Sequence, residues 1–119
     1  MGPMRSILVR YRVKRDRPAE NERLVKNVFE QLVREAPEGL RYFTFKLPDG
    51  VTFVHVAMDE RADGTSTLGK LSAFKEFGTG IAERCDTQPV VTELELVGAY
   101  ISPAGLRAAS HSQPPGSES

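Results

Sequence analysis

Apolar and polar positions along the chain repeat with two different periods. A period of two, which is typical of strands with one buried face, occurs over residues 6–14, 40–47, 51–58 and 90–102. A helical spacing of apolar residues occurs over residues 19–36 and again from Ser72 to about Arg84. The pattern therefore predicts the order β-α-β-β-α-β. Gly78 and Gly80 weaken the second helix by roughly 1 kcal/mol each relative to alanine.

The turn Pro48-Asp49-Gly50 separates two runs of β-branched and aromatic residues and predicts a β-hairpin. We expect a type I turn closed by a glycine bulge, with a two-residue primed turn as the competitor. In the bulged register Phe43 opposes His55, whereas a slip of one residue would place His55 opposite Thr44. We prefer the first register because it gathers three phenylalanines on the face of His55, namely Phe43, Phe45 and Phe53.

Two consecutive split βαβ units predict an α+β, ferredoxin-like fold whose antiparallel sheet has the strand order 4-1-3-2 and both helices on one face. The alternation places one set of residues under the helices with His55: Ile7, Val9, Tyr11, Val13, Leu94 and Leu96. The other face is expected to carry a charge ladder of Arg10, Arg12 and Lys14 beside Glu93 and Glu95, together with Tyr42, Val54, Val56 and Met58. That face is too apolar to leave in water, so we expect a homodimer formed through it.

The size and composition limit the possible classes of protein. The 119 residues fit one domain, expected over residues 6–102 with flexible segments at 1–5 and 103–119. Sixteen basic and sixteen acidic residues balance, which gives no electrostatic reason to expect nucleic acid or an anionic membrane as a partner. A single cysteine, Cys85, excludes an internal disulfide, and the two histidines give no metal-site spacing. No segment suits a membrane span or a signal peptide, so a cytoplasmic location is expected.

His55 is the candidate catalytic residue, because it is the only interior position that titrates near neutral pH. As a general base beside Tyr11 and Phe43, it would take a proton from a phenolic or enolic substrate. The competing interpretation is a buried neutral histidine bonded to a backbone carbonyl, Thr44 or Tyr11. Residues 59–67 form a polar loop that is a candidate lid.

The Phe-Val-His-Val strand and the later Ala-Phe-Lys-Glu-Phe…Pro-Val-Val-Thr-Glu-Leu stretch resemble the antibiotic-biosynthesis-monooxygenase-like proteins of the dimeric α/β-barrel superfamily. The resemblance covers about residues 5–102. It implies a dimeric α/β barrel with a pocket between sheet and helices in each subunit. Its members include cofactor-free oxygenases of quinol-like or polycyclic aromatic substrates and haem-degrading enzymes. The haem-degrading branch uses an Asn, a Trp and a His, and this chain has no tryptophan.

Two hypotheses follow. In the first, the protein is a cofactor-independent monooxygenase of a small aromatic or quinol-like substrate, with no metal. His55 is then catalytic, and the substrate-binding residues are Tyr11, Phe43, Phe53, Phe74 and Phe77. In the second, it is a non-catalytic dimeric module that binds a small hydrophobic ligand or a partner protein. An enzyme predicts that His55 reaches an open pocket, whereas the module predicts a filled core with His55 fully hydrogen-bonded.

Overall fold

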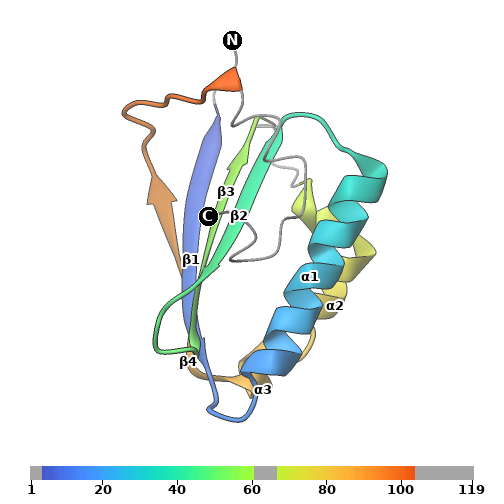
Figure 1. The fold of residues 1–119 in the computed structure, drawn as a ribbon, viewed down its shortest axis with the longest axis vertical. Coiled ribbons are helices and arrows are strands. Elements are labelled where there is room, and N and C mark those ends of the chain that lie inside the picture. The colour runs from blue at the N-terminus through green and yellow to red at the C-terminus, as the bar shows by residue number, and fades with distance from the viewer. Residues whose placement is uncertain (1–3, 61–66, 104–119) are drawn as a thin grey trace.

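The computed structural model describes residues 4–60 and 67–103, and its elements follow the predicted order. They are β1 (Arg5–Val13), α1 (Pro18–Glu35), β2 (Leu40–Lys46), β3 (Thr52–Asp59), the short 3-10 turn η1 (Leu68–Lys70), α2 (Ser72–Gly78), α3 (Ile81–Arg84) and β4 (Cys85–Leu94). The four strands form one antiparallel sheet in the order β2-β3-β1-β4, and the helices cover one of its faces (Figure 1). The predicted ferredoxin-like fold and strand order are confirmed. The predicted lid and both terminal segments fall largely outside the described residues.

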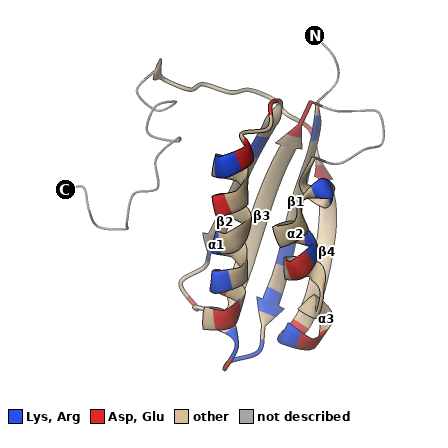
Figure 2. Ribbon diagram, turned by 90° about the vertical axis from the view of Figure 1, so that its right-hand side faces the viewer, with Lys and Arg blue, Asp and Glu red and all other residues tan. Residues whose placement is uncertain are grey.

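The first helix begins and ends where its sequence dictates. Pro18 stands in its first turn, where a missing N–H costs nothing. The apolar stripe of Leu24, Val25 and Val28 is buried against the sheet. The helix stops at Ala36, which takes the left-handed conformation at φ 48° and donates its N–H to the Leu32 carbonyl at 2.7 Å. Charged residues line the outer surface of this helix (Figure 2).

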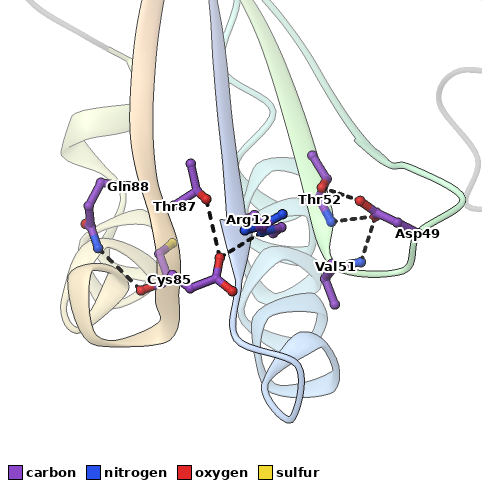
Figure 3. Close-up of polar contacts among 8 residues, drawn as sticks. Arg12, Asp49, Val51, Thr52, Cys85, Thr87 and Gln88 are labelled. Atoms are coloured by element: carbon purple, nitrogen blue, oxygen red, sulfur yellow. Dashed lines mark hydrogen bonds and ion pairs between the residues drawn. The ribbon is translucent and has the colours of Figure 1, made fainter.

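The preferred hairpin register is wrong, and the alternative with Thr44 opposite His55 is the observed one. The Asp49 carboxylate explains the shift. It accepts hydrogen bonds from the backbone N–H of Val51 and Thr52 at 3.0 and 2.9 Å, and from the Thr52 hydroxyl at 2.6 Å (Figure 3). These bonds draw Val51 out of the ladder into the turn, so Leu47 pairs with Thr52 instead of Val51.

The shifted register exchanges the two faces of β2. Tyr42 and Thr44 now lie on the helix-covered face with His55, whereas Phe43 and Phe45 lie on the open face with exposed fractions of 43% and 55%. The prediction that three phenylalanines share the face of His55 is therefore wrong for Phe43 and Phe45. Phe53 alone keeps its predicted place, and it is 2% exposed.

The second helix is interrupted where its glycines stand. Gly80 adopts φ +84°, a conformation that an L-residue side chain rarely takes, and this kink divides the predicted helix into α2 and α3. The chain turns early as a result, and β4 begins at Cys85 instead of the predicted residue 90.

The predicted faces of β4 are also wrong. Leu94 pairs with Ser6 and lies on the open face, and Glu93 pairs with Ile7 on the opposite face. The expected charge ladder is not formed: Arg12 pairs with Asp86 at 2.8 Å, and Glu93 lies 3.6 Å from Arg5. Two irregularities interrupt the pairing of β1 with β4 between Arg10 and Val13, before the regular stretch from Val90 to Leu94.

Candidate functional site

The imidazole of His55 lies at the centre of the sheet, as predicted, on the face beneath the helices. His55 pairs with Val9 of β1 on one side and with Thr44 of β2 on the other. Its side chain is buried, with only 5% of the residue exposed. The Pro-Asp-Gly turn therefore aims the ring inward even though the register of the hairpin differs from the predicted one.

Both ring nitrogens of His55 are hydrogen-bonded. Nε2 lies 2.7 Å from the Tyr11 hydroxyl, and Nδ1 lies 2.6 Å from the Tyr42 hydroxyl and 3.2 Å from the Thr44 hydroxyl. The expected contact with Tyr11 and the contact with Thr44 are both present. Tyr42, in contrast, was expected on the opposite face of the sheet.

The hydrogen bonds continue beyond Tyr11 across the interior. The Asn21 amide of α1 donates to the Tyr11 oxygen at 2.8 Å, and the Arg84 Nε of α3 donates to Asn21 Oδ1 at 3.1 Å. An unbroken polar chain thus runs from Arg84 through Asn21, Tyr11 and His55 to Tyr42. We call this the interior chain; it connects α3, α1, β1, β3 and β2.

The interior chain has a direction, because its first member can only donate. Arg84 donates to Asn21 Oδ1, so the Asn21 nitrogen faces Tyr11 and donates to its oxygen. The Tyr11 proton must then go to Nε2 of His55, which leaves the proton of the neutral ring on Nδ1, facing Tyr42. This tautomer is assigned from the donor order of the network.

Burial keeps the members of the interior chain other than Arg84 uncharged at neutral pH. It lowers the pKa of His55 from its usual 6.5 to about 4. Burial likewise raises the pKa of Tyr42 to about 12, and it raises the pKa of Tyr11 well above that of a free tyrosine. A neutral imidazole between two neutral phenols is the resting state of the site.

Arg84 closes the inner end of the interior chain as a buried cation that is 2% exposed. Its Nη2 donates to the Phe77 carbonyl at 2.7 Å, and its Nη1 lies 3.4 Å from the Thr79 carbonyl. These carbonyls belong to the C-terminal end of α2, which carries partial negative charge. The guanidinium carbon also lies 5.2 Å from the centre of the Phe77 ring, within range of a cation–π contact.

Aromatic rings surround the interior chain. Tyr11 stacks on Phe53 with ring centres 5.7 Å apart, and Phe77 lies 5.4 Å from the His55 ring. Phe29 of α1 stacks on Tyr42 at 5.0 Å. Of the predicted substrate-binding residues, the structure brings Tyr11, Phe53 and Phe77 around His55. Phe74 contacts Phe77 at 6.0 Å, and Phe43 lies on the other side of the sheet.

Sequence reasoning missed three polar residues that complete the site, namely Asn21, Tyr42 and Arg84, and one buried polar residue outside it, Gln31. The burial of Asn21 and Gln31 could have been predicted from the sequence. Both fall on the apolar stripe of the first helix, at helical spacing from Leu24 and Val28. Gln31 is buried and its carbonyl accepts from the Ala73 N–H at 2.9 Å, so it joins α1 to the start of α2.

Two further classes of site are absent from the described part of the chain. Within residues 4–60 and 67–103, no three His, Cys, Asp or Glu side chains gather as metal ligands. No helix among those same residues is both long and apolar enough to cross a membrane.

Known structures share this fold. No protein-family model matches the chain, and no curated protein sequence matches it significantly. A Nitrosomonas europaea protein, provisionally named an antibiotic biosynthesis monooxygenase, superposes with a TM-score of 0.67 and 16% identity, covering 82% of this chain and 93% of that one. A Mycobacterium tuberculosis protein gives 0.68 and 15%, covering 82% and 98%.

A third structure, named antibiotic biosynthesis monooxygenase, gives a TM-score of 0.66 and 14% identity, covering 81% of this chain and all of its own. The chain therefore has the fold of antibiotic-biosynthesis-monooxygenase-like proteins, as its sequence pattern indicated.

Proposed function

We propose that this protein is a homodimer that oxygenates a small, quinol-like aromatic substrate without a cofactor. The observation that carries the proposal is the interior chain, which brings titratable groups from Arg84 out to the half-buried Tyr42. A run of buried polar side chains costs desolvation energy that an apolar core of the same size avoids. Such a feature in a small domain favours a role in binding or chemistry over one in stability alone.

The proposed reaction converts a ring CH2 group and molecular oxygen into a carbonyl and water. Loss of a proton from the substrate to bulk water gives a carbanion, which transfers one electron to oxygen. The resulting radical and superoxide join in a new C–O bond, and the peroxide anion formed takes up a proton to give a hydroperoxide. Loss of water from the hydroperoxide leaves the carbonyl. The substrate itself supplies the electrons, and atoms and charge balance.

We assign His55 a positioning role in this reaction. The hypothesis that it takes the substrate proton directly needs a free nitrogen and a pKa near 7. In the described state Tyr11 already donates to Nε2, and burial holds the pKa near 4. His55 instead orients the Tyr42 hydroxyl through Nδ1.

Oxygen uptake with a panel of anthrones, which carry the ring CH2 group that the reaction needs, tests the proposal. Wild-type protein should consume oxygen and release the corresponding anthraquinone in equal amounts. His55→Phe should lower kcat, because the orienting bond to Tyr42 is lost, while the exposed-site control Val33→Ala should leave turnover unchanged. Absence of uptake above the spontaneous rate across the panel would remove the oxygenase assignment.

The open face of the sheet supports the dimer. It carries Leu8, Phe43, Phe45, Val54, Val56, Met58, Val90 and Leu94, of which the two phenylalanines, Val90 and Leu94 are at least 39% exposed. A monomer would leave this apolar surface in water. Light scattering should therefore give twice the chain mass, and Phe45→Lys should give a folded monomer. A wild-type monomer at micromolar concentration would refute the dimer.

The balanced charge and a buried, unpaired Cys85 fit our proposal of a cytoplasmic location, since thiols stay reduced there.

A second candidate is the non-catalytic dimeric module. The 5% exposure of His55 and the hydrogen bonds at both of its nitrogens favour it. It predicts that native mass spectrometry finds a retained small hydrophobic molecule and that the oxygen panel gives no turnover.

A further inference from the structure

We infer that Tyr42, together with the adjacent Thr44, donates a hydrogen bond to an acceptor oxygen of the ligand. The ligand oxygen would be a carbonyl or an ionised phenolate or enolate of a small aromatic compound, in preference to a neutral phenol hydroxyl. This inference rests on the proposed function, because it names the form of the substrate or product that the same site binds.

The direction of the interior chain is the first support. Every proton from Arg84 outward points toward Tyr42, because Arg84 has donors only. The last bond of that sequence has Nδ1 of His55 donating to the Tyr42 oxygen at 2.6 Å. The Tyr42 proton therefore cannot point back at His55.

The number of protons at the outer end is the second support. The Thr44 hydroxyl lies 3.2 Å from Nδ1 of His55, so the hydroxyls of Tyr42 and Thr44 are both within hydrogen-bond distance of this one N–H. One hydroxyl can donate to the other, and the remaining hydroxyl proton then has no acceptor within this cluster. A ligand oxygen that accepts this proton would complete the network.

The opposite direction is disfavoured inside the protein. If Tyr42 donated to His55, then Nε2 would carry the proton and donate to the Tyr11 oxygen. That oxygen already accepts from Asn21, and the Tyr11 proton would find no acceptor among the described residues around its buried position, where the residue is 1% exposed. An unpaired buried donor is costly, so a ligand that must itself donate to Tyr42 is bound less well.

The position of Tyr42 makes it the end that a ligand can reach. It belongs to β2, one of the two edge strands of the described sheet, and it is half-buried whereas Tyr11 and Asn21 are buried. Phe29 stacks on its ring with an angle of 19° between the planes and fixes its orientation. Aromatic ligands suit such a ring-lined wall.

The direction of hydrogen-bond donation along the interior chain can be measured without any ligand. Nitrogen-15 NMR of the wild-type protein should show His55 protonated at Nδ1 and bare at Nε2. Asn21→Asp is nearly the same size, can still pair with Arg84, and offers Tyr11 an acceptor in place of a donor. This variant should reverse the direction of donation along the interior chain and move the proton of the His55 ring to Nε2. A wild-type ring protonated at Nε2 would overturn the inference.

Ligand binding tests the outward donor. Under anaerobic conditions at pH 6, wild-type protein should bind 1,4-naphthoquinone about three- to tenfold more tightly than neutral 1,4-naphthohydroquinone, as expected for one hydrogen bond. Tyr42→Phe and Asn21→Asp should each abolish that preference. The control Tyr100→Phe changes a tyrosine that is 88% exposed and should keep it.

Each outcome of the binding test decides the inference. Equal affinity for the two probes, failure of the wild-type protein to bind either probe, or an unchanged preference in Tyr42→Phe would each overturn it. The proposed oxygenase fails on a different result, namely no oxygen uptake by protein that still binds the quinone preferentially.

Discussion

Replacing Arg84 with methionine should destabilise the domain by about 3 kcal/mol. Methionine fills most of the same space and keeps contact with the Phe77 ring. It leaves Asn21 Oδ1 and the Phe77 carbonyl without the donors that now lie at 3.1 and 2.7 Å. Each unpaired buried acceptor costs about 1–3 kcal/mol, and release of the buried cation offsets part of the sum. The 3.4 Å contact with Thr79 is too long to add much.

Urea unfolding followed by circular dichroism measures this change at one fixed protein concentration. A loss of about 3 kcal/mol corresponds to a melting temperature lower by roughly 10–20 °C for a domain near 100 residues. Arg23→Met is the matched control, because Arg23 is exposed on α1 and should change stability by less than about 0.5 kcal/mol. If Arg84→Met unfolds at the same urea concentration as the control, the interior chain has no energetic importance at this end.

A double-mutant cycle separates the hydrogen bond from the loss of packing. Asn21→Leu alone leaves the Arg84 Nε unpaired, and Arg84→Met alone leaves the Asn21 oxygen unpaired. The double variant removes both partners and should be more stable than the sum of the two losses by about 1–2 kcal/mol. Strict additivity would mean that the two side chains are not coupled.

Three further predictions use other parts of the fold. Because the pKa of His55 is about 4 when folded and about 6.5 when unfolded, the unfolded state binds more protons between these values. The free energy of unfolding should thus be undiminished above pH 6.5 and fall by about 3 kcal/mol toward pH 4, and urea titrations of His55→Asn should lack that part of the loss. Asp49→Ala should speed hydrogen exchange at the backbone amides of Val51 and Thr52, which now donate hydrogen bonds to the Asp49 carboxylate. Unchanged exchange rates at these two amides would refute the role of Asp49 in setting the register. Gly80→Ala should cost about 1–2 kcal/mol because of φ +84°, whereas Gly78→Ala, with open space around it, should be neutral or stabilising; equal melting temperatures would contradict this.

The fold could be predicted from the sequence because hydrophobic periodicity and turn residues specify elements locally. The β-α-β-β-α-β order, the first helix and the inward face of His55 all follow from such local patterns. The hairpin register could not be predicted in this way. It depends on whether the Asp49 side chain competes with the ladder for two backbone amides, and both outcomes leave a plausible alternation on β2.

The site was harder to predict because its residues come from five elements and most are polar types that usually lie on surfaces. Arg84 is the last residue of the short helix α3, where a cation is expected to lie in solvent, yet it is 2% exposed. Asn21 could have been suspected from its place on an apolar stripe. The pairing of Tyr42 with His55 followed only from the correct register.

The interior chain has a consequence for how related sequences can diverge. Each inner member is hydrogen-bonded to a neighbour on both sides, so exchanging one residue by itself leaves the next without its hydrogen-bond partner. Lineages that lose the arrangement should therefore lose it in a concerted way, with apolar residues replacing several members together, and lineages that keep it should show correlated replacements among distant positions.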